Sequence, residues 1–197
     1  MVYGKVKNYN MSFTTGGLLE RETIIFANMF LQTNDLEKTC QQIKDENLFQ
    51  YRTVTATKRI LSELKSRFRF LDNEALRLIS VGFPNEIQQI SWFSVCNKYP
   101  FIFEFVYEVI REKYLVGQLE LTNYDFDTFF NKKMVQHPTL EKITDNSRYK
   151  LKQILFKMLR EVGLLDKKNI LQTISPTRQV VSFIANKAPN YLGIFIN

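Results

Sequence analysis

Apolar residues recur at intervals of three or four positions through most of this 197-residue chain, and this spacing constrains the fold more than any other feature. An α-helix completes a turn about every 3.6 residues, so the pattern is typical of helices that bury one face. The strict alternation expected of a half-buried strand is nearly absent. Glycine (7 residues) and proline (5 residues) are scarce, which favours long helices over a turn-rich sandwich. The sequence therefore predicts an all-α protein, folded as a compact bundle of several helices.

Capping residues, glycines and prolines divide this pattern into separate helices. Thr14 or Thr15 is expected to cap the first helix, Asn34 the second, Asp72 the short helix that ends at Gly82, and Thr144 the long helix that begins at residue 145. Further helices are expected at 53–71, 73–82, 85–98, 101–114, 124–136, 139–143 and 145–162, with a last one beginning at Ser175 and Pro176. The order of helix, turn, short helix, turn and long helix across 124–162 fits a helix-turn-helix. Residues 164–174 fit either a strand or a small wing.

A domain boundary is expected between Gly117 and Thr122. It would separate an N-terminal helical domain (1–117) from a C-terminal helix-turn-helix-like domain (118–197). The net charge of +7 indicates a basic surface, which favours nucleic acid, an acidic protein or an anionic membrane as partner. Residues 1–117 hold 15 basic and 13 acidic groups, whereas residues 118–197 hold 12 and 7, so the second part is the more basic.

The cysteines and the apolar segments indicate a cytoplasmic protein. Cys40 and Cys96 lie far apart and outside any C-x-x-C pair, so neither a disulfide framework nor a zinc ribbon is expected. The first 15 residues are polar and lack the pattern of a signal peptide. The most apolar stretch, residues 99–110, contains Glu104 and Glu108 and is shorter than the roughly 20 residues of a spanning helix. We therefore expect a buried helix there, and no membrane association.

The sequence contains no pattern that predicts an enzyme. Its one histidine, His137, precedes Pro138 and is expected to be a turn residue. There is no phosphate-binding glycine loop, no dinucleotide-binding motif, no nucleophile elbow and no zinc-protease motif. We therefore predict no catalytic, cofactor-binding or metal-binding residues.

Two of the expected helices have a basic face opposite an apolar stripe, as in many helices that bind nucleic acid. From Arg52 to Arg69 there are six basic residues and one acid, Glu63, so local ion pairs cannot neutralise this segment. The predicted contacts on the first helix are Thr55, Lys58, Arg59, Ser62, Lys65 and Arg69, and those on the second are Lys150, Lys157 and Arg160. Each face alone fits a solvated surface equally well, but the presence of two favours binding.

Three segments of the chain are distinctive in combination and order: MSFTTGGLLERET (11–23), RTVTATKRI (52–60) and HPTLEKITDNSRYKLKQILFKMLREVGLL (137–165). Together they resemble the BrxA family of BREX bacteriophage-defence systems. The resemblance implies a helical fold related to the antitermination factor NusB and a DNA-associated role. It also implies work alongside a methyltransferase, an ATPase and a phosphatase-like subunit, and it implies no catalytic residue. Through the second and third segments it adds Arg52, Arg148 and Lys152 to the predicted DNA contacts.

Two functions remain open at this point. The first is a non-enzymatic accessory subunit that binds duplex DNA mainly through backbone phosphates, using the two basic faces. The alternative is a protein-interaction scaffold whose basic surface docks an acidic partner subunit of the same system. Salt dependence and a requirement for nucleic acid distinguish them.

Overall fold

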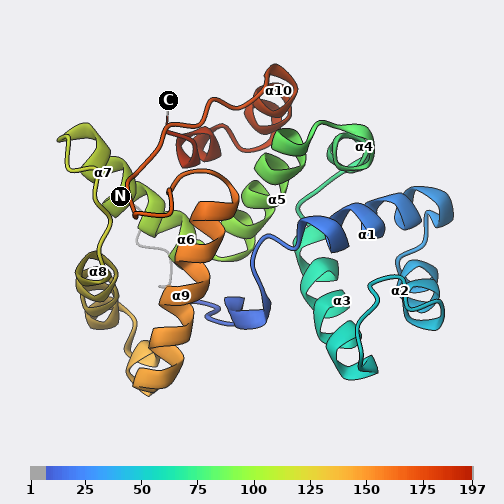
Figure 1. The fold of residues 1–197 in the computed structure, drawn as a ribbon, viewed down its shortest axis with the longest axis horizontal. Helices are drawn as coiled ribbons and strands as arrows, with labels where there is room; N and C mark the ends of the chain where they lie inside the picture. Colours follow the sequence, from blue (N-terminus) through green and yellow to red (C-terminus); the bar gives the residue numbers. More distant parts are fainter. Residues whose placement is uncertain (1–7, 197) are drawn as a thin grey trace. The chain divides into compact units, whose positions relative to one another are not determined.

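The structure is a computed structural model that describes residues 8–196. Within this range the backbone forms ten α-helices joined by short 3₁₀ and π segments, with two isolated β-bridges and no strand (Figure 1). The all-α prediction is confirmed. No helix in this range combines the length and apolarity needed to cross a membrane. Residues 1–7, on which the signal-peptide expectation partly depends, lie outside the described range.

The described chain divides into two compact units, each made of segments distant in sequence. Unit 1 comprises residues 8–17, 99–175 and 193–196, and unit 2 comprises residues 18–98 and 176–192. The boundary expected near residue 117 lies inside unit 1. Ion pairs join the two sides of that boundary, since Lys113 Nζ pairs with Asp125 at 3.0 Å and Lys132 Nζ pairs with Glu108 at 2.9 Å. The division into domains 1–117 and 118–197 stays a prediction about which segments fold independently.

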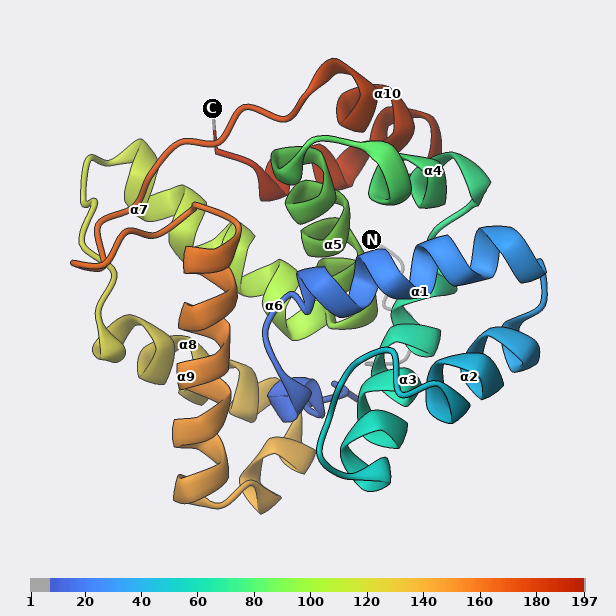
Figure 2. The same ribbon diagram turned by 45° about the vertical axis from the view of Figure 1, so that its right-hand side comes forward.

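Unit 2 is a bundle of six α-helices, which Figures 1 and 2 show from two sides. They are α1 (Glu20–Thr33), α2 (Leu36–Asp45), α3 (Val54–Phe68), α4 (Asn73–Val81), α5 (Pro84–Lys98) and α10 (Arg178–Lys187). Helix α1 packs against α2, α3, α4 and α5, and α10 packs against α5. Because α5 is covered from several sides, its residues Trp92, Phe93, Val95 and Cys96 are fully buried.

Unit 1 is built around a cluster of phenylalanines. Its helices are α6 (Pro100–Phe105), the π segment η2 (Val106–Ile110), α7 (Arg111–Leu115), α8 (Asn123–Gln136) and α9 (Asp145–Glu161). Three 3₁₀ segments are η1 (Phe13–Thr15), η3 (Pro138–Lys142) and η4 (Pro189–Ile194), the last of which continues into this unit from unit 2. Phe101 and Phe105 on α6 meet Phe129 on α8 edge to face, with ring centroids 5.1 and 5.2 Å apart. Buried aromatic pairs of this kind stabilise the contact between the two helices.

The structure corrects two predicted caps and confirms others. Thr14 and Thr15 lie in η1, and α1 begins only at Glu20, after Leu19 turns the chain with a left-handed φ of 59°. Asn34 ends α1, and the neighbouring Asp35 caps α2 by accepting hydrogen bonds from two backbone N–H groups. The caps predicted at Asp72 and Thr144 are confirmed.

Three expected elements take a different form. The helix expected at 101–114 is continuous but contains the π segment, and the one expected at 139–143 is 3₁₀ helix η3. Thr177, rather than Ser175, caps the last helix, which starts at Arg178. Residues 164–174 form the bridge Leu165–Leu171 in place of a strand. The wing, the helix-turn-helix arrangement and the relation to NusB stay predictions.

Candidate nucleic-acid interface

Helix α3 separates buried apolar residues from an exposed polar face. The Thr53 hydroxyl starts the helix by accepting a hydrogen bond from Ala56 N–H, and Ile60, Leu61 and Leu64 turn into the core of unit 2. At 100° per residue, Arg59 and Ser62 lie on the opposite side. The buried stripe is shorter than the sequence indicates, because Val54 in the first turn is 66% exposed.

Most of the residues predicted as DNA contacts on this helix are accessible. Arg52, Thr55, Lys58, Arg59, Ser62 and Arg69 are exposed, and Lys65 is half-buried. The ion pairs formed by α3 with other described residues involve only Lys65, Arg67 and Glu63. Four cations, Arg52, Lys58, Arg59 and Arg69, therefore have no carboxylate partner within residues 8–196. Together with the Thr55 and Ser62 hydroxyls they form what we call the α3 basic face.

The single acid of this segment points away from that face. Glu63 is buried and pairs with Arg67 Nε at 2.7 Å and with Lys98 Nζ on α5 at 2.6 Å. Arg67, only 1% exposed, also donates to the carbonyl oxygen of Leu18 at 2.9 Å. Arg67 is thus a core residue, and five rather than six cations of the segment reach the surface. Burial lowers the pKa of Lys98, and its hydrogen bond to Glu63 opposes that shift.

Lys65 differs from the other surface cations of this segment because it is already paired with a carboxylate. Its ammonium group donates a hydrogen bond to Glu37 on α2, and this bond raises the pKa of Lys65 above its usual value. Since Glu37 is itself highly exposed, the pair is open to competition from solvent and salt. Lys65 is therefore the weakest member of the predicted set on this helix.

Two of the predicted DNA contacts on α9, Arg148 and Lys152, lie together because both bind the same carboxylate of α8. Arg148 Nε and Lys152 Nζ both bind the Asp127 carboxylate of α8, at 3.2 and 3.1 Å. The Arg148 guanidinium also lies over the Phe130 ring, 4.5 Å from its centroid. These contacts hold α8 against α9, so neither cation is free to meet a phosphate.

The other predicted contacts on α9 do not form a continuous face. Lys157 lies 3.5 Å from Glu161, and Arg160 donates to the Asn169 side chain at 2.6 Å. Lys150 and Arg160 are both exposed and without an ion pair to a described residue, but Lys150 alone of the two also lacks a hydrogen bond to a described side chain. The second predicted site is consequently weaker than the first, although residues 118–197 carry the larger excess of positive charge.

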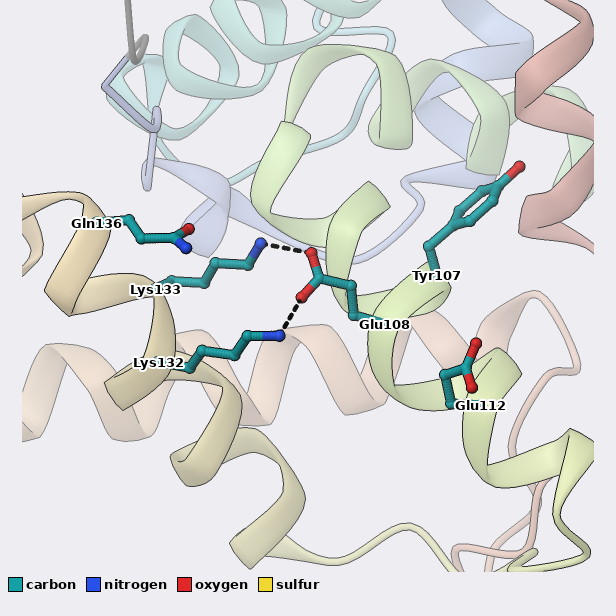
Figure 3. Close-up of a pocket in the computed structure, with 6 residues that line it drawn as sticks. All are labelled: Tyr107, Glu108, Glu112, Lys132, Lys133 and Gln136. Atoms are coloured by element: carbon teal, nitrogen blue, oxygen red, sulfur yellow. Dashed lines mark hydrogen bonds and ion pairs between the residues drawn. The ribbon is translucent and has the colours of Figure 1, made fainter. Parts of the chain in front are cut away.

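A cleft of about 580 Å³ in unit 1 is a site that the sequence did not indicate. Figure 3 shows the amines of Lys132 and Lys133 converging on Glu108 of the π segment, at 2.9 and 2.6 Å. The cleft is lined by Tyr107, Glu108, Glu112, Lys132, Lys133 and Gln136. Although burial opposes it, hydrogen bonding to the two lysines lowers the pKa of Glu108. The helical spacing of Glu104 and Glu108 was visible in sequence, but their lysine partners lie on another helix.

This network neutralises itself and continues into the unit. Lys133 is buried and also binds Glu104, which accepts a hydrogen bond of 2.5 Å from the Tyr9 hydroxyl. Burial, together with the neighbouring Glu104, raises the pKa of Tyr9 and keeps the phenol protonated. With both lysines bound to carboxylates, the geometry favours a structural role over activation of a substrate.

Other candidate reactive residues lie in the interior. His137 ends α8, is buried, and packs against Tyr9 with ring centroids 4.0 Å apart and ring planes tilted by 36°. Burial raises the pKa of the Cys40 and Cys96 thiols, which makes each a weaker nucleophile. Residues 8–196 contain no group of three or more side chains placed to hold a metal ion.

Comparison with known proteins extends these observations. The family model described as BrxA matches residues 7–188. The chain is 35% identical over 120 residues to the BREX protein BrxA of Bacillus cereus (strain H3081.97), a match covering 61% of this chain and 60% of that protein. It is 28% identical over 151 residues to the BREX protein BrxA of Escherichia coli O9:H4 (strain HS), covering 77% and 71%. The first match thus spans less than two thirds of that relative's length.

A solved structure has the same fold. The crystal structure of an uncharacterized protein from Magnetospirillum magneticum superposes with a TM-score of 0.83, covering 95% of this chain and 96% of the other. Only 18% of the residues are identical, so this likeness concerns the fold alone.

Proposed function

Because the chain belongs to the BrxA family, we propose that it is a component of a BREX bacteriophage-defence system and binds duplex DNA without catalysing a reaction. The observation that carries the DNA-binding proposal is the α3 basic face. Its four cations are exposed and have no carboxylate partner among the described residues, so they are available to an external polyanion.

Phosphates are the groups that this face fits best. Arginine and lysine gain affinity for DNA by displacing condensed counterions, and threonine and serine hydroxyls donate hydrogen bonds to phosphate oxygens. Lys58 and Arg69 are eleven positions apart, which corresponds to about 16 Å along a helix axis. The face therefore spans several phosphates of one duplex, spaced by about 3.4 Å of axis along each strand.

The arrangement predicts binding with little sequence preference. No residue of the face has geometry that commits it to a base edge, and phosphate contacts carry no sequence information directly. The dissociation constant should accordingly lie between about 10⁻⁴ and 10⁻⁶ M at physiological salt, as for other non-specific complexes.

The proposal is tested with purified full-length protein and two unrelated duplexes of about 20 base pairs, titrated at salt concentrations from about 50 to 200 mM. If all four cations meet phosphates, log affinity should fall against log salt with a slope of about −3.6, which is 0.9 for each contact. The two duplexes should give the same slope within error. An absence of binding at the lowest salt would refute the proposal and favour the scaffold hypothesis.

A further inference from the structure

An apolar cleft opens beside the C-terminal end of the α3 basic face, within unit 2. It has a volume of about 260 Å³ and is lined by Phe30, Leu36, Phe68, Arg69, Leu71, Asn73 and Leu76. Three of the apolar lining residues, Phe30, Leu36 and Leu71, are only half-buried. The cleft is thus a place where apolar side chains from α1, α2 and the α3–α4 connection remain partly in contact with water.

Arg69 is the single charged residue of this lining, and its neighbours do not neutralise it. Asp72, the nearest acid along the chain, caps α4 and pairs with Lys187 Nζ at 2.5 Å. Glu37, which follows the lining residue Leu36, binds Lys65. An apolar cleft with one available cation at its edge is complementary to an apolar group that carries a negative charge beside it.

We propose that this cleft is a docking site for an acidic segment of a partner protein. One aromatic or aliphatic side chain of the segment fills the cleft, and a neighbouring carboxylate pairs with Arg69. The volume supports a side chain as the occupant, because small-molecule sites usually measure about 300 to 1,000 Å³. Single side chains inserted into apolar pockets are also the groups that contribute most to many protein interfaces.

The position of Arg69 connects this site to the DNA-binding proposal. A carboxylate that pairs with Arg69 removes one of the four cations of the α3 basic face, and it places negative charge where a phosphate would lie. Partner and duplex DNA should therefore compete. This competition rests on the proposed function, whereas the docking site itself does not.

The docking site is tested without DNA, using a short blocked peptide as the probe. The probe is acetyl-Glu-Asp-Phe-Asp-Glu-amide, titrated into ¹⁵N-labelled full-length protein and followed by amide shifts. Two control peptides replace Phe with Ala, or the four acids with Gln and Asn. Because burying a phenylalanine side chain contributes about 1.5–3 kcal/mol, the Ala peptide should bind at least about tenfold more weakly.

Two variants and a matched control locate the site. Arg69→Gln should weaken binding of the Phe peptide by about two- to fivefold, and it should not weaken the neutral Phe peptide further. Leu71→Trp, which places a larger side chain in the cleft, should reduce binding of both Phe peptides. Arg77→Gln removes an exposed arginine of α4 that does not line the cleft, and it should leave the affinity unchanged.

Several results would overturn the proposal. They are equal affinity of the Phe and Ala peptides, an equal loss in Arg69→Gln and Arg77→Gln, or no shifts at millimolar peptide. A dimer in sedimentation that Leu71→Trp dissociates would identify the occupant as a second copy of this chain, which also contradicts it. None of these results bears on DNA binding, which is measured separately.

Discussion

The α3 basic face gives a quantitative prediction for a triple variant, Arg52→Gln, Lys58→Gln and Arg59→Gln. These residues are exposed, and none pairs with a carboxylate among the described residues. If each meets one phosphate, the slope of log affinity against log salt should become shallower by about 2.7, or 0.9 for each lost contact. The loss should be the same on unrelated duplexes, since phosphate contacts carry no base information.

The matched control is a triple variant on α9, Lys150→Gln, Lys157→Gln and Arg160→Gln. It lowers the net charge by the same three units, so long-range attraction to DNA falls equally in both proteins. The slope of log affinity against log salt should become much shallower in the α3 variant than in the α9 variant, because Lys157 and Arg160 already have partners.

Fluorescence anisotropy with a labelled duplex at several salt concentrations measures both slopes, and urea denaturation checks that both variants fold. Exposed side chains without ion pairs should change the free energy of unfolding by no more than about 0.5 kcal/mol. A folded α3 variant that binds like the wild type at every salt concentration would show that this helix is an ordinary solvated face. An equal loss in the α9 variant would show that net charge, rather than the α3 basic face, controls binding.

Two predictions concern stability. Glu63→Gln should lower the free energy of unfolding by about 3–5 kcal/mol in urea denaturation, since it leaves Arg67 and Lys98 without their buried carboxylate, whereas the exposed Glu74→Gln should change little. At the start of α8, hydrogen bonds from the capping threonine and a nearby lysine outweigh burial and lower the pKa of Asp125 below 3.8. Asp125 should therefore stabilise the fold above pH 3.8 and lose this contribution as the pH falls through its lowered pKa. The measurement is the urea midpoint of the wild type and of Asp125→Asn at several acidic pH values. If the midpoint of both proteins changes with pH in the same way, the prediction is wrong.

The helical fold could be predicted because its determinants are local. The apolar spacing defines which faces are buried, and residues such as Asp72 and Thr144 satisfy backbone N–H groups only a few positions away. Errors arose where neighbouring residues compete for the same role. Asn34 and Asp35 are both good caps, and the left-handed turn at Asn34, which ends α1, leaves capping of α2 to Asp35.

The candidate site could be predicted only in part, because counting charges along a segment does not show where they point. Glu63 and Arg67 are four positions apart on α3, so their spacing alone indicates an ion pair, but at 100° per residue Glu63 lies only about 40° from Arg59, and its burial could not be predicted from its angle. The pairing of Arg148 and Lys152 with Asp127 could not be predicted in this way, since the two helices meet only in the folded chain.

The distribution of acids therefore distinguishes the two basic helices better than the number of cations does. In unit 2, Glu63 faces the core and Asp72 binds Lys187, and Glu37 takes up one predicted contact of α3, Lys65, so the four cations of the α3 basic face keep their charge. In unit 1, Asp127 and Glu161 take up cations of α9 directly. A carboxylate that pairs with a cation away from the basic face does not neutralise the cations of that face. A carboxylate that pairs with a cation on the face removes that cation's positive charge. Helix α9 consequently presents fewer available cations than α3, although it belongs to the more basic stretch of sequence, and α3 is the helix on which DNA binding should depend.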